Sequence, residues 1–202
     1  MKVKICGITT LPAAKVVEKS GADFIGFVFA PSSRSITPED AANIAKQLSP
    51  KLKKVGVFVN ESIETIEAIA TKVGLDIIQL HGDESEAFAK KLPYPIIKAF
   101  SIDKVKPNQI RSYPAEYLLI DSPGDNYRGG SGKTFSWELL DELDIPRERL
   151  ILAGGLSSDN INQAIELVRP YGVDVSSGVE SKKQKDHEKI KSFIAYAKQE
   201  RG

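Results

Sequence analysis

A thiol and a carboxyl group each stand at the end of an apolar run that is typical of a buried strand. Cys6 follows Ile5 near the N-terminus, and Asp121 follows the apolar run 117–120. A cysteine with an ordinary pKa near ~8.5 needs only a modest shift to act as a general base. A carboxyl group in an apolar setting retains its proton more readily and suits a general acid. The two residues therefore predict an acid–base pair, provided that the fold brings them to one face.

Each residue also has a structural interpretation. A lone cysteine is more often a small buried hydrophobic side chain, and an aspartate in this position is as often a helix-capping group. Lys4 shares strand parity with Cys6, so both are expected to point into the interior, where the ammonium group would favour the thiolate. Asp174 is a candidate substrate-site residue that is expected to pair with Lys4. This pairing predicts that Asp174→Asn raises the pKa of Cys6.

Groups that suit anions lie in other loops. A guanidinium matches a carboxylate with two parallel hydrogen bonds, so Arg34 is either a carboxylate clamp or a solvated loop residue. Two turns, Gly154-Gly155 and Ser177-Gly178, let backbone N–H groups approach an anion and predict a phosphate site. His81 is a further candidate at the substrate site, interpreted mainly as a hydrogen-bonded structural residue.

The elements that would position these groups alternate along the chain. Strands are expected at Val3–Ile8, Phe24–Phe29, Val55–Val59, Ile77–His81, Ile96–Phe100, Tyr117–Asp121, Leu150–Ala153 and Val173–Ser176. Helices are expected at Leu11–Ser20, Pro38–Leu48, Ile63–Val73, Glu84–Leu92, Lys104–Ser112, Asp159–Val168 and Asp186–Lys198. Eight such repeats predict an α/β fold in which residues 1–202 form a single (β/α)8 TIM barrel domain with a parallel eight-stranded core.

Closure of the barrel would bring the chemistry together. Strands one and six would lie three steps apart around the ring, and the loops after strands seven and eight form the common phosphate site of such barrels. Cys6 and Asp121 would then flank a substrate whose phosphate is held between them. The loop 122–136 contains four glycines and is expected to be a lid. Its Gly132-Lys133-Thr134 segment resembles part of a nucleotide-binding loop, but Tyr127 stands where that motif needs glycine.

Composition sets further limits. The net charge of +1 creates no strong field for nucleic acid or an acidic membrane surface, and no apolar run approaches the length of a membrane span. The single cysteine excludes an intrachain disulfide. We expect a cytoplasmic protein with a small-molecule partner and no metal, either a monomer or a homodimer.

Taken together, these segments resemble the phosphoribosylanthranilate isomerase family. The matching motifs run in family order along the chain: Lys4-Ile5-Cys6-Gly7-Ile8-Thr9, Gly26-Phe27-Val28-Phe29, Pro31-Ser32-Ser33-Arg34, Val55-Gly56-Val57-Phe58-Val59-Asn60, Gln79-Leu80-His81-Gly82, Asp121-Ser122, Gly129-Gly130-Ser131-Gly132-Lys133-Thr134-Phe135 with Trp137, Leu152-Ala153-Gly154-Gly155-Leu156, and Asp174-Val175-Ser176-Ser177-Gly178-Val179-Glu180. One departure is that the family commonly has a Pro-Gly pair before Lys-Asp after this glutamate, whereas this chain has Ser181-Lys182-Lys183-Gln184-Lys185-Asp186.

The resemblance implies an Amadori rearrangement of N-(5-phosphoribosyl)anthranilate to 1-(2-carboxyphenylamino)-1-deoxyribulose 5-phosphate in tryptophan biosynthesis, without a cofactor. It places the general base on Cys6, the general acid on Asp121 and the contact with the anthranilate carboxylate on Arg34. Phosphate would bind at the turns formed by Gly154, Gly155, Ser177 and Gly178.

Two alternatives remain open. A related barrel of the histidine or tryptophan pathway could act on another phosphorylated sugar, although the histidine-pathway isomerase typically offers an aspartate where this chain has Cys6. A non-catalytic protein that binds sugar phosphates would need the phosphate turns but not Cys6, Asp121 or Arg34.

Overall fold

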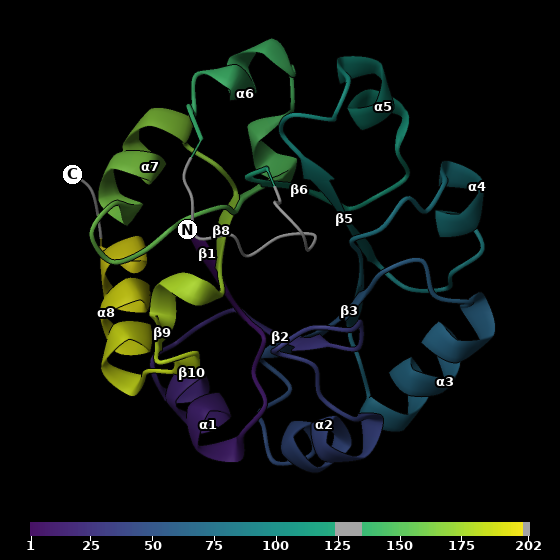
Figure 1. Ribbon diagram of the computed structural model, residues 1–202, viewed down its shortest axis with the longest axis vertical. Helices are drawn as coiled ribbons and strands as arrows, with labels where there is room; N and C mark the ends of the chain where they lie inside the picture. The colour runs from purple at the N-terminus through teal and green to yellow at the C-terminus, as the bar shows by residue number, and fades with distance from the viewer. Residues whose placement is uncertain (124–134, 200–202) are drawn as a thin grey trace.

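Eight parallel strands pair in chain order and close into a barrel (Figure 1). This computed structural model describes residues 1–123 and 135–199, with Arg111 described through its backbone only. The strands are β1 (Lys2–Cys6), β2 (Phe24–Val28), β3 (Lys53–Phe58), β4 (Ile77–Leu80), β5 (Ile96–Ser101), β6 (Tyr117–Asp121), β7 (Leu150–Leu152) and β8 (Gly172–Val175). All eight expected strands are confirmed, with ends displaced by no more than two residues.

Helices surround the barrel and cover the outer faces of its strands (Figure 1). They are α1 (Leu11–Lys19), α2 (Pro38–Ala45), α3 (Ile63–Val73), α4 (Glu86–Ala89), α5 (Pro107–Ser112), α6 (Leu139–Glu142), α7 (Ile161–Val168) and α8 (His187–Lys198). Local signals explain several boundaries. Ser62 caps α3 by accepting a hydrogen bond from the Thr65 N–H, and Gly74 ends it in the left-handed conformation with φ of 72°.

Some expected helices are shorter in the structure. The helix expected from Glu84 begins at Glu86 because the Glu84 carboxylate is buried and accepts hydrogen bonds from the N–H groups of Asn60 and Gly82. The helix expected from Lys104 begins at Pro107, which suits the first helical position. The sequence analysis missed α6 and four other short elements: the 3₁₀ turns η1 (Arg147–Arg149) and η2 (Ser177–Val179), and the paired strands β9 (Glu180–Ser181) and β10 (Gln184–Lys185).

The core has two layers because successive strand residues point to opposite faces. The larger apolar cluster combines strand residues such as Val3 and Ile5 with the inner faces of the helices. The smaller cluster consists of alternate residues from strand segments, among them Phe24, Val55 and Leu119, and fills the barrel interior. Lys4 and Cys6 belong to the same inward-facing set as Phe24, since Lys4 is paired with Phe24 in the sheet. The expected parity of Lys4 and Cys6 is consistent with this register.

Two further expectations concern the loop 122–136 and membrane-spanning segments. Residues 124–134, which include most of the expected lid and the Gly132-Lys133-Thr134 segment, lie outside the described residues. Within the described part of the chain, no helix is both long enough and apolar enough to cross a membrane.

The antiparallel hairpin β9–β10 turns through Lys182 and Lys183, at the position where the chain departs from the family pattern. Ser181 pairs with Gln184, so the loop contains two residues, and both have positive φ, 52° at Lys182 and 64° at Lys183. A two-residue turn with both φ positive is a type I′ turn, which strongly favours Asn-Gly. The hairpin is therefore retained in the structure with two residues that are unfavourable for its turn.

We predict that the double substitution Lys182→Asn and Lys183→Gly stabilises the protein by about 1 kcal/mol, because it relieves two left-handed non-glycine residues. Urea unfolding followed by circular dichroism measures the change. Lys51→Gly is the matched control: Lys51 is an exposed turn lysine without positive φ, so glycine there should lower stability. An equal or lower stability of the double variant would contradict the strain assigned to the turn.

Candidate active site

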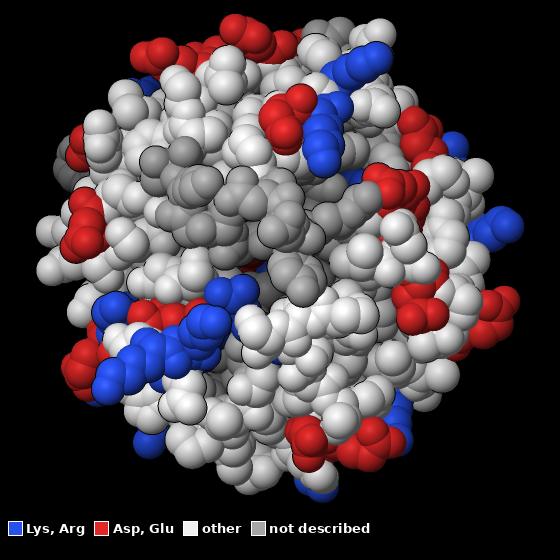
Figure 2. Space-filling model, in the orientation of Figure 1, with Lys and Arg blue, Asp and Glu red and all other residues white. Residues whose placement is uncertain are grey.

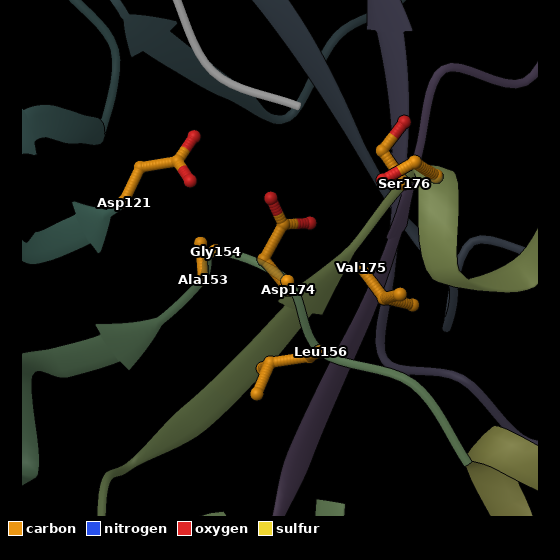
Figure 3. Close-up of a pocket in the computed structure, with 9 residues that line it drawn as sticks. Asp121, Ala153, Gly154, Leu156, Asp174, Val175 and Ser176 are labelled. Carbon is orange, nitrogen blue, oxygen red and sulfur yellow. The ribbon is translucent and has the colours of Figure 1, made fainter. Parts of the chain in front are cut away.

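A hollow that is partly open to solvent lies where β6, β7 and β8 end. Its lining combines carboxylates with glycine and serine turns: Asp121, Ala153, Gly154, Gly155, Leu156, Asp174, Val175, Ser176 and Ser177. Figure 3 shows the carboxyl groups of Asp121 and Asp174 directed toward a common space, with Gly154 between their strands. The hollow is therefore at the carboxyl ends of the strands, where barrel enzymes place their catalytic groups.

The carboxyl group of Asp121 is removed from solvent. It is 7% exposed and accepts hydrogen bonds from the Ser122 N–H at 2.8 Å and from the Ser122 hydroxyl at 3.4 Å. Burial, followed by the negative charge of Asp174, raises the pKa of Asp121 to about 6, while the Ser122 hydrogen bonds and the Lys4 charge oppose the rise. Such a group retains a proton far closer to neutral pH than an ordinary aspartate does.

The expected pairing of Lys4 with Asp174 is confirmed. The two residues lie opposite each other in the β1–β8 register, and the ammonium Nζ is 2.9 Å from Asp174 Oδ1. Their side chains are 1% and 10% exposed. Because an isolated buried charge is strongly unfavourable, each group makes the burial of the other tolerable.

Cys6 is buried, at 7% exposed, and within reach of the charges of this ion pair. Burial raises the pKa of the Cys6 thiol above its ordinary value and outweighs the charge and hydrogen bond of Lys4, which lower it. The expectation that Asp174→Asn raises the pKa of Cys6 has the wrong sign. The carboxylate of Asp174 itself disfavours the thiolate, so its removal favours the thiolate.

The two glycine turns lie against each other beside the carboxylates. Gly154 and Gly155 have φ of 87° and 63°, a conformation that side chains rarely adopt. Ser177 lines the hollow, whereas Gly178 lies where the turns touch: a Cβ there would be 1.8 Å from the carbonyl oxygen of Leu156. Glycine at position 178 therefore permits the close approach of the second turn to the first.

Arg34 is not a solvated loop residue. Its Nε and Nη2 donate to the two carboxylate oxygens of Glu180 at 2.7 and 3.0 Å. The side chain passes over Gly7, since a Cβ on Gly7 would be 2.8 Å from Arg34 Cδ. Two of its five N–H donors are thus already used by a carboxylate of the protein itself, beside the end of β1.

His81 approaches the carboxyl group of Asp121. Its Nε2 is 3.8 Å from Asp121 Oδ2, and its Nδ1 is 2.9 Å from the amide nitrogen of Gln79. An amide nitrogen only donates, so Nδ1 accepts and the ring proton is placed on Nε2, toward Asp121. Within residues 1–123 and 135–199, no cluster of three or more histidine, cysteine or acidic side chains could hold a metal ion.

Comparison with known proteins addresses the origin of this arrangement. A family model described as N-(5′-phosphoribosyl)anthranilate (PRA) isomerase matches residues 3–196. The chain belongs to this family. A relative from Bacillus cereus, named N-(5′-phosphoribosyl)anthranilate isomerase, is 50% identical over 201 residues and 98% of both chains.

Two solved structures extend the comparison. Monomers of the dimeric phosphoribosylanthranilate isomerase of Thermotoga maritima share 41% identity with a TM-score of 0.84, over 98% of each chain. A phosphoribosylanthranilate isomerase in complex with reduced 1-(o-carboxyphenylamino)-1-deoxyribulose 5-phosphate shares 40% identity with a TM-score of 0.82, also over 98% of each chain. Membership of this family makes the chain an isomerase of tryptophan biosynthesis with a TIM barrel fold.

Two residues of the site were not singled out from the sequence. Glu180 holds the guanidinium of Arg34, and Lys185 holds Glu180 through a contact of 2.7 Å. The family motif includes Glu180 as its last residue but does not indicate which side chain Glu180 contacts. Lys185 stands in a run of lysines that looks solvated, and only the β9–β10 pairing, with Lys185 opposite Glu180, brings its side chain inward.

We predict that the substitution Asp121→Asn changes the free energy of unfolding more favourably at pH 8 than at pH 4. The folded-state pKa of about 6 lies above the unfolded value, so the stability contributed by Asp121 falls as pH rises from about 4 to about 6. Asparagine carries no charge at either pH. The difference in unfolding free energy between variant and wild type should therefore increase by about 2 kcal/mol between pH 4 and pH 8. Urea unfolding at both values measures it, and an unchanged difference would contradict the raised pKa.

Proposed function

We propose that the chain converts N-(5′-phosphoribosyl)anthranilate to the carboxyphenylamino deoxyribulose 5-phosphate, with Asp121 as general acid and Cys6 as general base. The observation that carries this proposal is the Lys4–Asp174 ion pair, which acts electrostatically on both Cys6 and Asp121 from one end of the barrel. Cys6 and Asp121 thus lie near the same buried charges, at the carboxyl ends of β1 and β6.

Asp121 would act first, by donating its proton to the ring oxygen of the ribose. Cleavage of the bond between this oxygen and C1′ opens the furanose and leaves a protonated imine. The raised pKa supplies the protonated carboxyl group that this step requires. An anionic phosphate bound at the adjacent glycine turns would raise the pKa further, since a nearby negative charge disfavours the carboxylate.

Cys6 would act second. The cationic imine acidifies the neighbouring C2′ proton, which the thiolate removes to give an enolamine that tautomerises to the ketone. Lys4 favours the thiolate by its charge and by a hydrogen bond, and Lys185 favours it by its charge. These cations counter the burial that would otherwise keep the thiol protonated.

Binding of the two ends of the substrate would use separate groups. The backbone N–H groups of Gly154, Gly155 and Ser177 suit the phosphate. Arg34 suits the anthranilate carboxylate through the N–H groups that Glu180 does not engage. His81, beside Asp121, and Asp174, which lines the hollow, would border the reacting carbons.

The alternatives considered from the sequence are less well supported. The family match and the carboxyphenylamino ligand of a 40% identical relative favour the anthranilate substrate over other phosphorylated sugars. A protein that only binds sugar phosphates would gain nothing from burying Asp121 beside Asp174, an arrangement that lowers stability. We further propose a cytoplasmic location, which suits a biosynthetic enzyme with an unpaired cysteine. The relative from Thermotoga maritima is dimeric, which makes a homodimer as well as a monomer a possible form of this chain.

We predict that Cys6→Ala and Asp121→Asn each lower kcat by about 10²–10⁴-fold, the usual contribution of one acid–base step. The loss of anthranilate fluorescence during turnover measures the rate. Ser20→Ala, an exchange near the end of α1 and remote from the hollow, is a control that should retain wild-type kcat. Turnover near the wild-type rate in either catalytic variant would remove that residue from its role.

The pH profile tests the charges around the acid. Because the acid titrates below the base, the productive form with protonated Asp121 and Cys6 thiolate is a minor species. Its population, and with it kcat/KM of the wild type, should rise up to about pH 6, the pKa of Asp121, and fall above the pKa of Cys6. Asp174→Asn removes a negative charge that raises the pKa of Asp121, so the rising limb should move to lower pH by about one unit.

Asp23→Asn is the matched control for that profile. Asp23 is also an aspartate that binds a lysine of β1, but it accepts from Lys2, four residues before Cys6. Its substitution should leave the rising limb in place. A limb that does not move in Asp174→Asn, or that moves equally in both variants, would show that Asp174 does not set the pKa of Asp121.

A further inference from the structure

Glu180 and Lys185 form an ordered set of contacts with Arg34 at the rim of the site. Arg34 donates to both carboxylate oxygens of Glu180, and Lys185 Nζ is 2.7 Å from Glu180 Oε1. The acidic and lysine side chains are 8% and 6% exposed, whereas that of Arg34 is 22% exposed. The guanidinium is therefore the outermost member of a buried group of three charges.

Lys185 connects this group to the second glycine turn. Its ammonium also donates to the carbonyl oxygen of Ser176 at 2.8 Å and approaches Ser176 Oγ at 3.2 Å. The Ser176 hydroxyl in turn donates to the carbonyl oxygen of Cys6. One ammonium thus connects the turn that contains Ser177, the strand end that carries Cys6, and the carboxylate that holds Arg34.

The charges of the group explain why a lysine is needed there. Without Lys185, Arg34 and Glu180 would form a pair with no net charge. The negative charge of Glu180 would then repel an anionic substrate nearby. Lys185 restores a net positive charge to the group. Figure 2 shows blue Lys and Arg atoms gathered beside the central hollow, over the region where β9 and β10 lie in Figure 1.

Geometry gives a second reason. A free arginine side chain loses about 2 kcal/mol of rotamer entropy when it is fixed. Glu180 engages Nε and Nη2, and among the described residues Nη1 makes no hydrogen bond. The guanidinium is held in one plane before substrate binds, with the Nη1 edge left for a carboxylate.

We propose that Glu180 and Lys185 are positioning residues for substrate binding: they orient Arg34 toward the substrate carboxylate. The inference rests on the carboxylate-binding role proposed for Arg34. It concerns binding of the anthranilate end of the substrate, because neither residue lines the hollow at the acid.

The titration of these groups agrees with this arrangement. Burial would raise the pKa of Glu180, but the hydrogen bonds from Arg34 and Lys185 hold it below its ordinary value. Burial lowers the pKa of Lys185, and the charges of Glu180 and Cys6 oppose this change. Lys185 also lowers the pKa of the Cys6 thiol, so Lys185→Met should move the alkaline limb of the kcat/KM profile upward.

A double-mutant cycle on Arg34→Met and Lys185→Met tests the proposal. The probes are anthranilate, which carries the carboxylate alone, and inorganic phosphate, each titrated by NMR. We expect each single variant to weaken anthranilate binding by about tenfold, and the double variant to bind no more weakly than Arg34→Met. Phosphate binding should change by less than threefold in Lys185→Met, and KM for the full substrate should rise more than kcat falls.

Three controls separate positioning from general damage. Lys54→Met removes a partly buried, ion-paired lysine from the start of β3 and should leave the affinity for anthranilate unchanged. Lys185→Arg retains the charge and should recover part of the anthranilate affinity. Thermal unfolding of each variant identifies any that fail to fold, in which case Glu180→Gln, which keeps the shape of the acceptor, replaces Lys185→Met in the cycle.

The outcomes are distinguishable. Additive losses in the double variant, or unchanged anthranilate binding in Lys185→Met, would overturn the positioning role while Arg34 keeps its own. Unchanged anthranilate binding in Arg34→Met would instead overturn the role proposed for Arg34, and the positioning role with it, while leaving Cys6 and Asp121 as the acid–base pair. A loss in Lys54→Met equal to that in Lys185→Met would also overturn the proposal, by showing that the effect is not local.

Discussion

The buried ion pair between Lys4 and Asp174 is the constraint on which the site depends. Two unpaired charges inside a barrel would cost several kcal/mol each, so neither residue can be removed without leaving the other unsatisfied. The parallel register of β1 and β8 sets the two residues opposite each other, and Lys4 Nζ lies 2.9 Å from Asp174 Oδ1. The pair then acts on two groups in opposite senses: the ammonium favours the thiolate of Cys6, and the carboxylate favours the protonated form of Asp121.

Strand-level features of this site could be predicted from the sequence because they follow from the two-residue period of a strand. Parity placed Lys4 and Cys6 on one face, and the ring order of eight strands placed Asp174 beside Lys4, as the structure confirms. The pKa of Cys6 was harder to predict, since its direction depends on how completely the thiol is buried. Burial outweighs the nearby ammonium, and no local pattern reports that balance.

Contacts between loops could not be predicted in the same way. Arg34 and Glu180 are 146 residues apart, and they meet only because the loop after β2 lies beside the hairpin that follows β8. Lys185 turns inward because it pairs with Glu180 across β9 and β10, which are two residues long each and carry no periodic signal. The type I′ turn at Lys182 and Lys183 was equally hidden, because lysine is an unusual residue for it.

The groups proposed for chemistry lie at one end of the barrel, and a set of stabilising contacts lies at the other. The carboxyl ends of the strands hold the buried Asp121 and the strained turn at Lys182, both of which lower stability. The amino ends hold contacts without such a penalty: Tyr117 stacks on Tyr171 at 4.8 Å, with their hydroxyl groups 3.1 Å apart, and Asp23 accepts from Lys2 and the backbone of Val3. The barrel can therefore hold a carboxyl group near neutral pKa at one end while contacts at the opposite end keep the ring closed.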